Sequence, residues 1–414
     1  MLRIAVIGGS LGGLTAGLLL RDAGHDVTVY ERAPVDLTGY GAGIVAHEVS
    51  VRYFLGRNAR PLDDFTVPVG RYRLVDSGGT LLCEERVAYR FVSWGSLYRA
   101  LLSEFGRERY VQATAMTCFA QNELEVIVTF ADGETHRCDL LVLADGVQST
   151  GRRTLFPAVD PVYSGYVAWR GTVEERDIPP AALLRLDGTL TYAVVPNSHI
   201  LVYPIPGVDG RVDRGHRLWN FVWYRNVPQG TALDGLMTGC DGTRHAVSLR
   251  PGQVQEWYVD ELKATACATL PGEIADVVAA TDEPFIQVVM DVVCPAMTVG
   301  RACIIGDAAF AARPHAAAGT AKAAENAWTL AEALHASGDA WSAALQAWSV
   351  GQTALGAQLT ARARHIGDGS QFRCDWRPGD PQLRFGLYAA GDSSIWTRTT
   401  LSNPDWWLRR AANA

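Results

Sequence analysis

The sequence of 414 residues predicts an α/β fold in which a domain built on a parallel sheet is interleaved with an antiparallel β-sheet domain and followed by a helical region. Three observations predict this architecture. Residues 1–35 alternate an apolar strand, a glycine-rich loop, an apolar helix and a second strand. Residues 166–227 alternate β-branched and aromatic residues between prolines and glycines, which is typical of antiparallel strands. Apolar helical periodicity then runs from about residue 321 to residue 364.

Length and composition indicate a soluble protein with more than one core. A chain of 414 residues that is 48% hydrophobic can bury two or more packed domains. A net charge of −7 argues against nucleic-acid binding, and no apolar stretch has the length of a membrane span. The first predicted strand follows the initiator methionine directly, so we expect no targeting peptide and a cytoplasmic location. The eight cysteines occur singly and without metal-ligand spacing.

The glycine-rich loop that begins seven residues after the initiator methionine fits the G-x-G-x-x-G phosphate loop, with Ser10 at the second glycine. Small residues let the backbone approach a pyrophosphate, and the following helix presents free N–H groups and a positive dipole end to it. Glu31 ends the second strand 18 residues past Gly13, where an acid can accept hydrogen bonds from ribose hydroxyls. The loop and helix residues predicted to contact a Rossmann-bound dinucleotide are Gly8, Gly9, Ser10, Gly12, Gly13 and Leu14.

Two further motifs follow apolar strands later in the chain. Asp145-Gly146 comes after LLVLA and precedes Ser149 and Arg152, and by itself this pair also fits a simple turn. Gly306-Asp307 ends a short buried strand, where a carboxylate could accept hydrogen bonds from ribityl hydroxyls. The helix that begins near Thr320 would direct its positive end toward negative charge on a reduced flavin.

These three motifs, with a β-rich region between the second and the third, resemble the group A flavin-dependent aromatic hydroxylases, the family of p-hydroxybenzoate hydroxylase. Segments similar to the hydroxypyridine branch of that family are RDAGHDVTVYER (21–32), GYVAWRG (165–171), YPIPG (203–207) and RPHAAAG (313–319). The resemblance extends from the N-terminus to about Arg398. It implies a Rossmann-like FAD-binding domain of the GR2 type, interleaved with an antiparallel β-sheet substrate domain and followed by a C-terminal helical region.

The resemblance implies non-covalent FAD as the cofactor and NADH or NADPH as the co-substrate. Glu31 and Arg32 would hold the adenosine ribose, and Asp145, with Arg152 as its partner, would belong to a motif for both FAD and nicotinamide binding. Asp307 would bind the ribityl chain. The residues implied along the isoalloxazine ring are Pro314, Ala317, Gly319 and Thr320. Because the chain has one nucleotide loop, the nicotinamide would bind transiently over the flavin.

The resemblance also implies boundaries for the domains. The FAD-binding domain would comprise residues 1–70, 92–165 and 285–335, and the substrate domain residues 71–91 and 166–284. Residues 336–414 would form the helical region and a tail that contains Trp406 and Trp407. The tail beyond Thr400 has no counterpart in the resemblance. The oligomeric state is left open, with a homodimer as one option.

The implied reaction is hydroxylation of a small aromatic or N-heteroaromatic ring, such as a hydroxypyridine or phenol, by O2 through a flavin hydroperoxide. The candidate substrate-site residues are His199, Tyr203, Trp223, Tyr224 and His315. The three aromatic residues also fit plain sheet packing. His199 follows a predicted turn, which also fits a surface position. His315 could deprotonate a hydroxyl, because imidazole titrates near neutrality.

Two positions depart from the family pattern, and other functions stay open. Trp94 and Phe310 stand where many members have Arg and His, which leaves the pyrophosphate and ring-edge contacts uncertain. Lys322 and Glu325 are expected to be solvated on their helix. The alternatives are a hydroxylase of a larger pyridine or phenol natural product and a non-catalytic flavoprotein. A flavin-dependent halogenase is disfavoured because WNFVWY does not match the Trp-x-Trp-x-Ile-Pro segment of that class.

Overall fold

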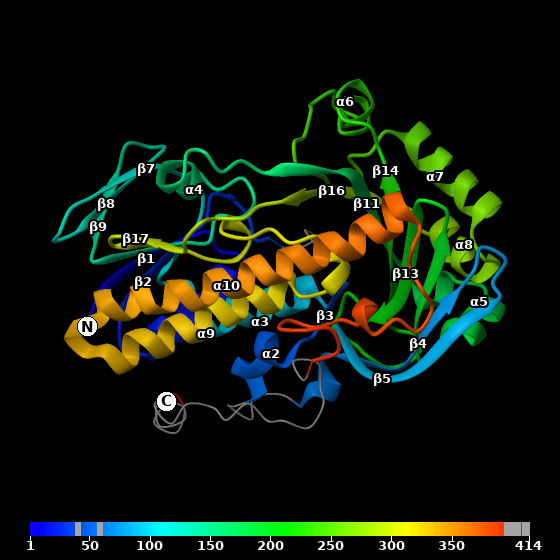
Figure 1. The fold of residues 1–414 in the computed structure, drawn as a ribbon, viewed down its shortest axis with the longest axis horizontal. Coiled ribbons are helices and arrows are strands. Elements are labelled where there is room, and N and C mark those ends of the chain that lie inside the picture. Colours follow the sequence, from blue (N-terminus) through cyan, green and yellow to red (C-terminus); the bar gives the residue numbers. More distant parts are fainter. Residues whose placement is uncertain (38–42, 56–60, 393–406, 408–414) are drawn as a thin grey trace.

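The computed structural model describes residues 1–37, 43–55, 61–392 and 407. Two large sheets lie at opposite ends of the molecule, and long helices run between them (Figure 1). The α/β fold with interleaved sheets and a helical C-terminal region is thereby confirmed. Trp407 is buried against Tyr53 and Trp328, whereas Trp406 lies outside the described residues.

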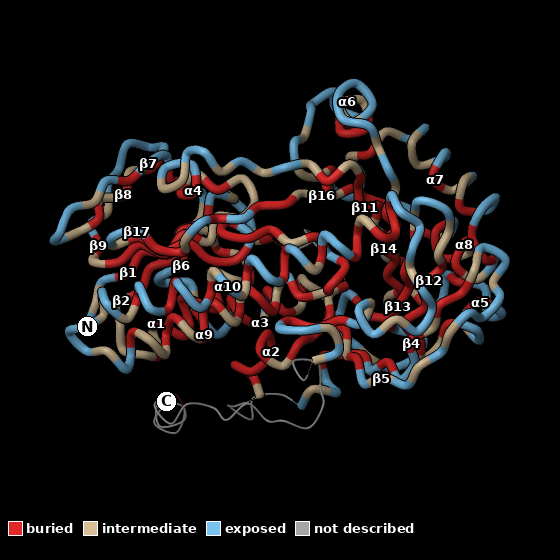
Figure 2. The backbone as a smooth tube through the Cα atoms, viewed as in Figure 1, coloured by how far each residue is buried: buried red, intermediate tan, exposed pale blue. Residues whose placement is uncertain are grey.

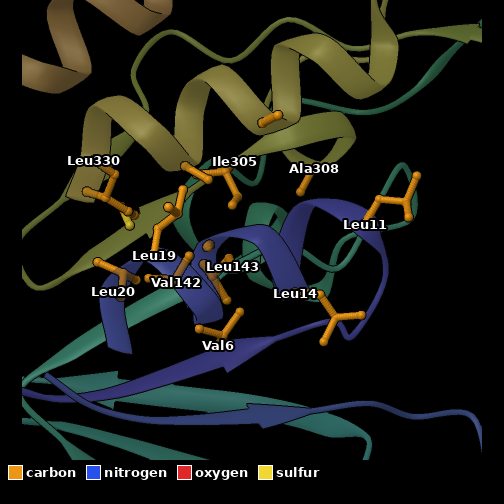
Figure 3. Close-up of a cluster of buried hydrophobic side chains, with 14 of the residues drawn as sticks. Val6, Leu11, Leu14, Leu19, Leu20, Val142, Leu143, Ile305, Ala308 and Leu330 are labelled. Carbon is orange, nitrogen blue, oxygen red and sulfur yellow. The ribbon is translucent and has the colours of Figure 1, made fainter. Parts of the chain in front are cut away.

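The six-stranded sheet carries the first βαβ unit. Its strand order is β17-β18-β10-β1-β2-β6, and all pairs are parallel except β17 with β18. The strands, in this order, are Thr298–Val299, Ala302–Ile304, Leu140–Leu143, Arg3–Ile7, Asp26–Tyr30 and Tyr110–Val111. Helix α1 (Leu11–Asp22) packs on this sheet and against α9 (Gly319–Ser337), with Leu14, Leu19 and Leu330 in the shared core (Figure 3).

The nine-stranded sheet forms the other end of the molecule. Its order is β15-β16-β11-β14-β13-β12-β4-β5-β3, and the pairs are antiparallel except β12 with β4. The strands in this order are Ser248–Leu249, Phe285–Asp291, Val162–Glu174, Leu218–Asn226, Ser198–Ile205, Thr189–Val195, Val67–Val75, Leu81–Ser93 and Gly43–Val45. The predicted antiparallel region at 166–227 therefore forms four central strands of this sheet.

Two strands of this sheet differ from the expected domain boundaries. Strand β16 pairs with β11, although residues from 285 onward were expected in the FAD-binding domain. Strand β3 likewise pairs with β5 in the nine-stranded sheet, although residues 1–70 were expected in the FAD-binding domain. Short apolar strands carry no local signal for the sheet that they join, because pairing is decided by contacts distant in sequence.

The remaining elements cover these sheets. A small antiparallel sheet consists of β7 (Met116–Gln121), β8 (Val126–Phe130) and β9 (Thr135–Cys138). The helices besides α1 and α9 are α2 (Glu48–Leu55), α3 (Trp94–Phe105), α4 (Thr150–Leu155), α5 (Pro180–Leu186), α6 (Thr231–Leu236), α7 (Glu256–Thr269), α8 (Gly272–Ala279) and α10 (Trp341–Asp368). Figure 2 shows the buried strands between more exposed outer helices. Each helix in the described part of the chain is too short or too polar to span a bilayer.

The two faces of the nine-stranded sheet pack differently, and this sets the position of the site. Side chains alternate between the faces along each strand. On β14, Trp223 belongs to the core that includes α5 and α8, whereas Tyr224 belongs to the core on the other face. That second face lies opposite the loop between β18 and α9. The cavity between this face and the loop is lined on the sheet side by alternate residues of the strands, such as His199, Leu201 and Tyr203 on β13.

Candidate active site

The phosphate loop is a close-packed turn in which two glycines are required by space. A Cβ on Gly13 would lie 1.8 Å from the carbonyl oxygen of Gly8, and a Cβ on Gly8 would lie 2.3 Å from that of Ala144. Gly8 also has a backbone φ of +103°, a conformation that residues other than glycine rarely adopt. Ser10 is the N-cap of α1 and makes no capping hydrogen bond with its side chain. The first turn of α1 therefore suits an anion supplied by a ligand.

Glu31 fixes this loop to the end of β2. Its carboxylate accepts hydrogen bonds from the backbone N–H of Gly9 at 2.7 Å and of Ala33 at 2.8 Å. Only 6% of the residue is exposed. The carboxylate oxygens still have lone pairs toward the cavity that Glu31 lines, so a role toward ribose hydroxyls is compatible with the loop contacts.

A cavity of about 620 Å³ opens at the carboxyl ends of β1, β2 and β10. This is where ligands bind on open parallel sheets. The predicted cofactor residues that line it are Gly8, Ser10, Glu31, Arg32 and Asp145. The prediction that Leu14 contacts the cofactor is wrong, because its side chain is fully buried in the core below α1 (Figure 3). Gly9 and Gly12 face Tyr110 and Ala323, where a Cβ would crowd those side chains.

Asp145 and Arg152, at the two ends of the Asp-Gly motif, each bond to other partners. Asp145 accepts hydrogen bonds from the Ser149 hydroxyl and from the backbone N–H of Gly151. The buried guanidinium of Arg152 donates to the carbonyl oxygens of Val147, Val159 and Ala308. Since Ala308 follows Asp307, Arg152 ties the second motif to the third.

A second cavity, of about 310 Å³, lies between the nine-stranded sheet and the loop after β18. Predicted residues that line it are His199, Tyr203, Tyr224, Asp307, Pro314, His315, Ala317, Gly319 and Thr320. Trp94 lines both cavities, so it stands where they adjoin. An extended ligand with its adenosine at Glu31 and its ring system at Pro314 fits this arrangement.

The loop from Asp307 to Thr320 is held by buried polar contacts. Lys322, only 1% exposed, donates to the Asp307 carboxylate at 2.9 Å and to the Phe310 carbonyl. The expectation that Lys322 is solvated is therefore wrong. Ala317 has a φ of +53°, and its carbonyl lies 2.9 Å from Nε2 of His47. These contacts hold the loop against the first turns of α9 and against His47.

His199 is buried in the cavity wall and not at the surface. The turn that precedes it ends before β13, and His199 is the second residue of that strand, 1% exposed. Its ring lies 4.6 Å from that of Tyr224, and its Nδ1 lies 3.2 Å from Nε2 of Gln371. Burial lowers the pKa of His199 to about 3. The side chain is neutral at physiological pH.

His315 is also buried and neutral, which corrects the expectation that it titrates near neutrality. Its Nε2 lies 2.7 Å from the Tyr166 hydroxyl, and its ring centroid is 5.2 Å from that of His199. Burial lowers the pKa of His315 well below its usual value, and nearby His199 and Arg313 lower it further. A neutral imidazole can accept or donate a hydrogen bond.

The three candidate aromatic residues take different positions. Tyr203 stacks on Phe91 and donates its hydroxyl to the Gly43 carbonyl at 2.9 Å. Tyr224 faces the two histidines in the cavity. The prediction that Trp223 lies in the substrate site is wrong. Its side chain lies on the opposite face of the sheet, and its Nε1 donates to the Ser198 hydroxyl at 2.9 Å.

Sequence reasoning missed Tyr166, Arg170, Tyr192 and Trp376, which lie in or beside the cavity wall. Tyr166, Ala168 and Arg170 occupy alternate positions of β11 and so share one face. That alternation within GYVAWRG was a usable signal. Trp376, beyond α10, gave none. Among the described residues, no group of His, Cys, Asp or Glu side chains could hold a metal ion.

Known proteins resemble the chain over almost its whole length. The NAD(P)-binding Rossmann-like domain family matches residues 6–65, and the FAD binding domain-like family matches residues 163–291. The 2,6-dihydroxypyridine 3-monooxygenase of Paenarthrobacter nicotinovorans is 36% identical over 407 residues, which are 96% of this chain and 98% of that protein. Salicylate hydroxylase of Pseudomonas putida is 28% identical over 80% of this chain and 77% of that protein.

A solved structure shows the same likeness. The structure of 2,6-dihydroxypyridine-3-hydroxylase from Arthrobacter nicotinovorans matches with a TM-score of 0.89 and 35% identity. The match covers 95% of this chain and 98% of that one. The arrangement of the two sheets and the helices between them is therefore shared with that enzyme.

Proposed function

Because the chain belongs to the group A FAD-dependent aromatic hydroxylases, we propose that it hydroxylates a small, electron-rich hydroxypyridine, with 2,6-dihydroxypyridine as the first substrate to test. The protein is an FAD-dependent monooxygenase that uses NAD(P)H. The substrate assignment is supported by the similarity to the hydroxypyridine enzymes over nearly the whole chain and by the polarity of the cavity.

The residues present fit FAD. The cradle of Gly8 and Gly13, the uncapped first turn of α1 and the Glu31 carboxylate suit the adenosine and pyrophosphate half. Asp307 and the loop Pro314–Thr320 would hold the ribityl chain and the ring system. When bound, FAD supplies electrons from NAD(P)H and transfers one oxygen atom of O2 to the substrate.

The chain's own residues supply a dry, oriented pocket. Tyr192, Tyr224 and Trp376 provide aromatic walls that can stack on a ring and exclude water. The observation that carries the proposal is the pair of buried, neutral imidazoles of His199 and His315 in that wall. They can hydrogen-bond to ring nitrogen and ring oxygen without adding a charge.

The cavity volume favours a single ring over a larger natural product. About 310 Å³ lies at the small end of the range for small-molecule sites. The same cavity adjoins the loop expected to hold the flavin ring, so the flavin would take part of this space. A one-ring substrate fits the remainder.

The test is substrate-stimulated NAD(P)H oxidation by the purified protein. We expect a yellow protein that oxidises NADH or NADPH faster when 2,6-dihydroxypyridine is added. Under ¹⁸O2 the product should gain one labelled oxygen by mass spectrometry. Unsubstituted pyridine serves as the control and should give no stimulation. A colourless protein that cannot be reconstituted with FAD, or a flavoprotein that no hydroxypyridine stimulates, would overturn the proposal.

A further inference from the structure

Three buried side chains extend from the cavity into the protein interior. His315 lines the cavity, and its Nε2 lies 2.7 Å from the hydroxyl of Tyr166. The guanidinium carbon of Arg313 lies 5.6 Å from the centre of the Tyr166 ring. None of the three is more than 7% exposed. Their hydrogen bonds are therefore made to other protein groups and not to bulk water.

The direction of the hydrogen bond between Tyr166 and His315 follows from the available acceptors. Arg313 carries only donors, so the phenolic proton cannot go to it. Among the described residues, Nε2 of His315 is the acceptor within reach of that hydroxyl. If Nε2 donated instead, the phenolic proton would be buried without an acceptor, which is costly. Tyr166 therefore donates and Nε2 accepts.

Arg313 is fixed as a cation beside Tyr166. Its guanidinium lies 3.1 Å from the Asp291 carboxylate and 2.6 Å from that of Asp368. Arg364 shares the Asp291 carboxylate at 3.1 Å. The positive charge of Arg313 favours a Tyr166 hydroxyl whose oxygen faces the cation and whose proton faces His315.

The groups around His315 keep its ring neutral. They are Tyr166 from β11, His199 from β13, Tyr224 from β14 and Arg313 from the adjoining loop. None of these is a carboxylate, and burial, His199 and Arg313 all lower the pKa of His315. A neutral imidazole carries one N–H. With Nε2 accepting from Tyr166, that proton is on Nδ1, which is shielded from solvent and has no partner among the described residues.

We propose that Tyr166, supported by Arg313, is a positioning residue that holds His315 in its Nδ1–H form, so that His315 donates a hydrogen bond to the bound ring and does not remove its proton. The inference rests on the proposed function for the identity of the ring. A fixed N–H donor stabilises an anionic ring oxygen, and the anionic ring is the more electron-rich form. His315 thus acts on the ionisation of the substrate without itself titrating.

The first test measures the tautomer directly. In the FAD-bound protein labelled with ¹⁵N-histidine, the His315 signals are assigned by their loss in His315→Asn. We expect the protonated-nitrogen shift at Nδ1 and the unprotonated shift at Nε2. Tyr166→Phe should move both shifts toward a mixture of tautomers. A proton on Nε2 in the unsubstituted protein would overturn the proposal, whatever ring the enzyme acts on.

The second test measures ionisation of a bound ring without turnover. The probe is 2-hydroxy-5-nitropyridine, whose anion is distinguished by its absorbance, titrated in complex with the oxidised FAD-bound enzyme. We expect Tyr166→Phe and His315→Leu each to weaken ionisation of the bound probe about tenfold, which raises its apparent pKa by about one unit. His315→Asn, which places an amide N–H near the position of Nδ1 but has no basic nitrogen, should stay within about threefold of the unsubstituted enzyme.

The variants separate a donor from a base. If His315→Asn loses ionisation as fully as His315→Leu, a basic nitrogen is required and the proposal fails. Tyr163→Phe, which removes a hydroxyl that donates to the Val227 carbonyl and is not part of the cavity lining, is the control and should leave the probe's pKa unchanged. If the probe does not bind at all, the substrate proposal is contradicted, and the histidine spectrum alone then decides the tautomer.

Discussion

Lys322 and Asp307 form an ion pair in which one partner is buried and the other is not. The Lys322 ammonium lies 2.9 Å from the carboxylate, with the lysine side chain 1% exposed and the aspartate side chain 57% exposed. The same ammonium also donates to the Phe310 carbonyl. The pair thus holds the loop that carries Asp307 against the first turns of α9, while leaving the carboxylate open to a ligand.

Removal of the buried ammonium should destabilise the fold. We expect Lys322→Met to lower the free energy of unfolding by about 1–3 kcal/mol, because the Phe310 carbonyl loses its donor. Asp307 adds little to this cost, since it can be solvated. Denaturant unfolding measures the change, and Lys263→Ala on α7 is the matched control, expected within about 0.5 kcal/mol of the unsubstituted protein. Equal effects at the two lysines would contradict the assignment.

Flavin retention should depend on Asp307 more than on the sheet aromatics. We expect Asp307→Ala to release FAD on gel filtration and to weaken FAD binding by about tenfold or more, because a charge-assisted hydrogen bond to the ribityl chain is lost. Tyr203→Phe should retain FAD, since its hydroxyl is bonded to the Gly43 carbonyl. Equal retention by both variants would count against these roles.

The phosphate loop should not tolerate a methyl group at Gly13. A Cβ there would lie 1.8 Å from the Gly8 carbonyl oxygen, so the turn must open. We expect Gly13→Ala to abolish FAD binding, measured by flavin fluorescence quenching, and to cost about 1–3 kcal/mol of stability. Gly351→Ala on α10 is the control, because a Cβ there has nothing within 4 Å and alanine favours helix. Normal FAD affinity in Gly13→Ala would refute this account of the loop.

Substitutions of the adjacent residues Trp223 and Tyr224 should affect different properties. A change at Trp223 should affect stability, and a change at Tyr224 should affect substrate binding. We expect Tyr224→Phe to raise KM for the ring substrate several-fold, because Tyr224 lines the cavity. Trp223→Phe should leave KM within twofold but lower stability by about 1–3 kcal/mol, since it shrinks a core side chain and leaves Ser198 without its donor. Steady-state kinetics and thermal unfolding distinguish the two. The reverse pattern would show that the faces of β14 are assigned wrongly.

Stability should fall as the pH drops below about 6.5. In the folded protein, burial lowers the pKa of His199 to about 3 and that of His47 to about 4, against 6.5 for the unfolded chain. Between these values the unfolded state binds more protons, so each histidine costs about 1.4 kcal/mol per pH unit. His199→Gln should reduce the slope of unfolding free energy against pH by about that amount between pH 6 and pH 4.5.

The control for this titration is the unsubstituted protein. Carboxylates contribute to the absolute slope in both proteins, so the comparison uses only the difference between them. If His199→Gln and the unsubstituted protein have the same slope, His199 is not held neutral by burial.

Local chemistry explains why the nucleotide half of the site could be predicted from sequence. The loop Gly8–Gly13 and the acid at Glu31 are short-range patterns, and the structure gives each a steric or hydrogen-bonding reason. Tyr203 and Tyr224, two of the candidates from the predicted antiparallel strands, line the cavity. Alternation along a strand cannot tell which face meets the cavity, so Trp223 was placed with its neighbour.

The substrate half depends on contacts distant in sequence. His199 follows a turn, which also fitted a surface position, but Gln371 and Trp376 from the segment after α10 contact its ring. Lys322 lies on an alanine-rich helix with little apolar contrast, and its burial is decided by the Phe310 carbonyl and Asp307. Neither packing partner leaves a mark in the local sequence.

The interleaving of the two sheets limits how this protein can be assembled and altered. Strand β16 pairs with β11 in the nine-stranded sheet, and β18 pairs with β10 in the six-stranded sheet. Strand β11 therefore lacks this neighbour until residue 291 has been synthesised, and β10 lacks its neighbour until residue 304 has been synthesised. A nascent chain that ends earlier exposes unpaired strands of both. For the same reason no contiguous segment carries the substrate cavity, and an exchange of one gene fragment between relatives would cut through both sheets. A change of specificity for the ring substrate in this fold has to come from individual substitutions on the face of the nine-stranded sheet that lines the substrate cavity.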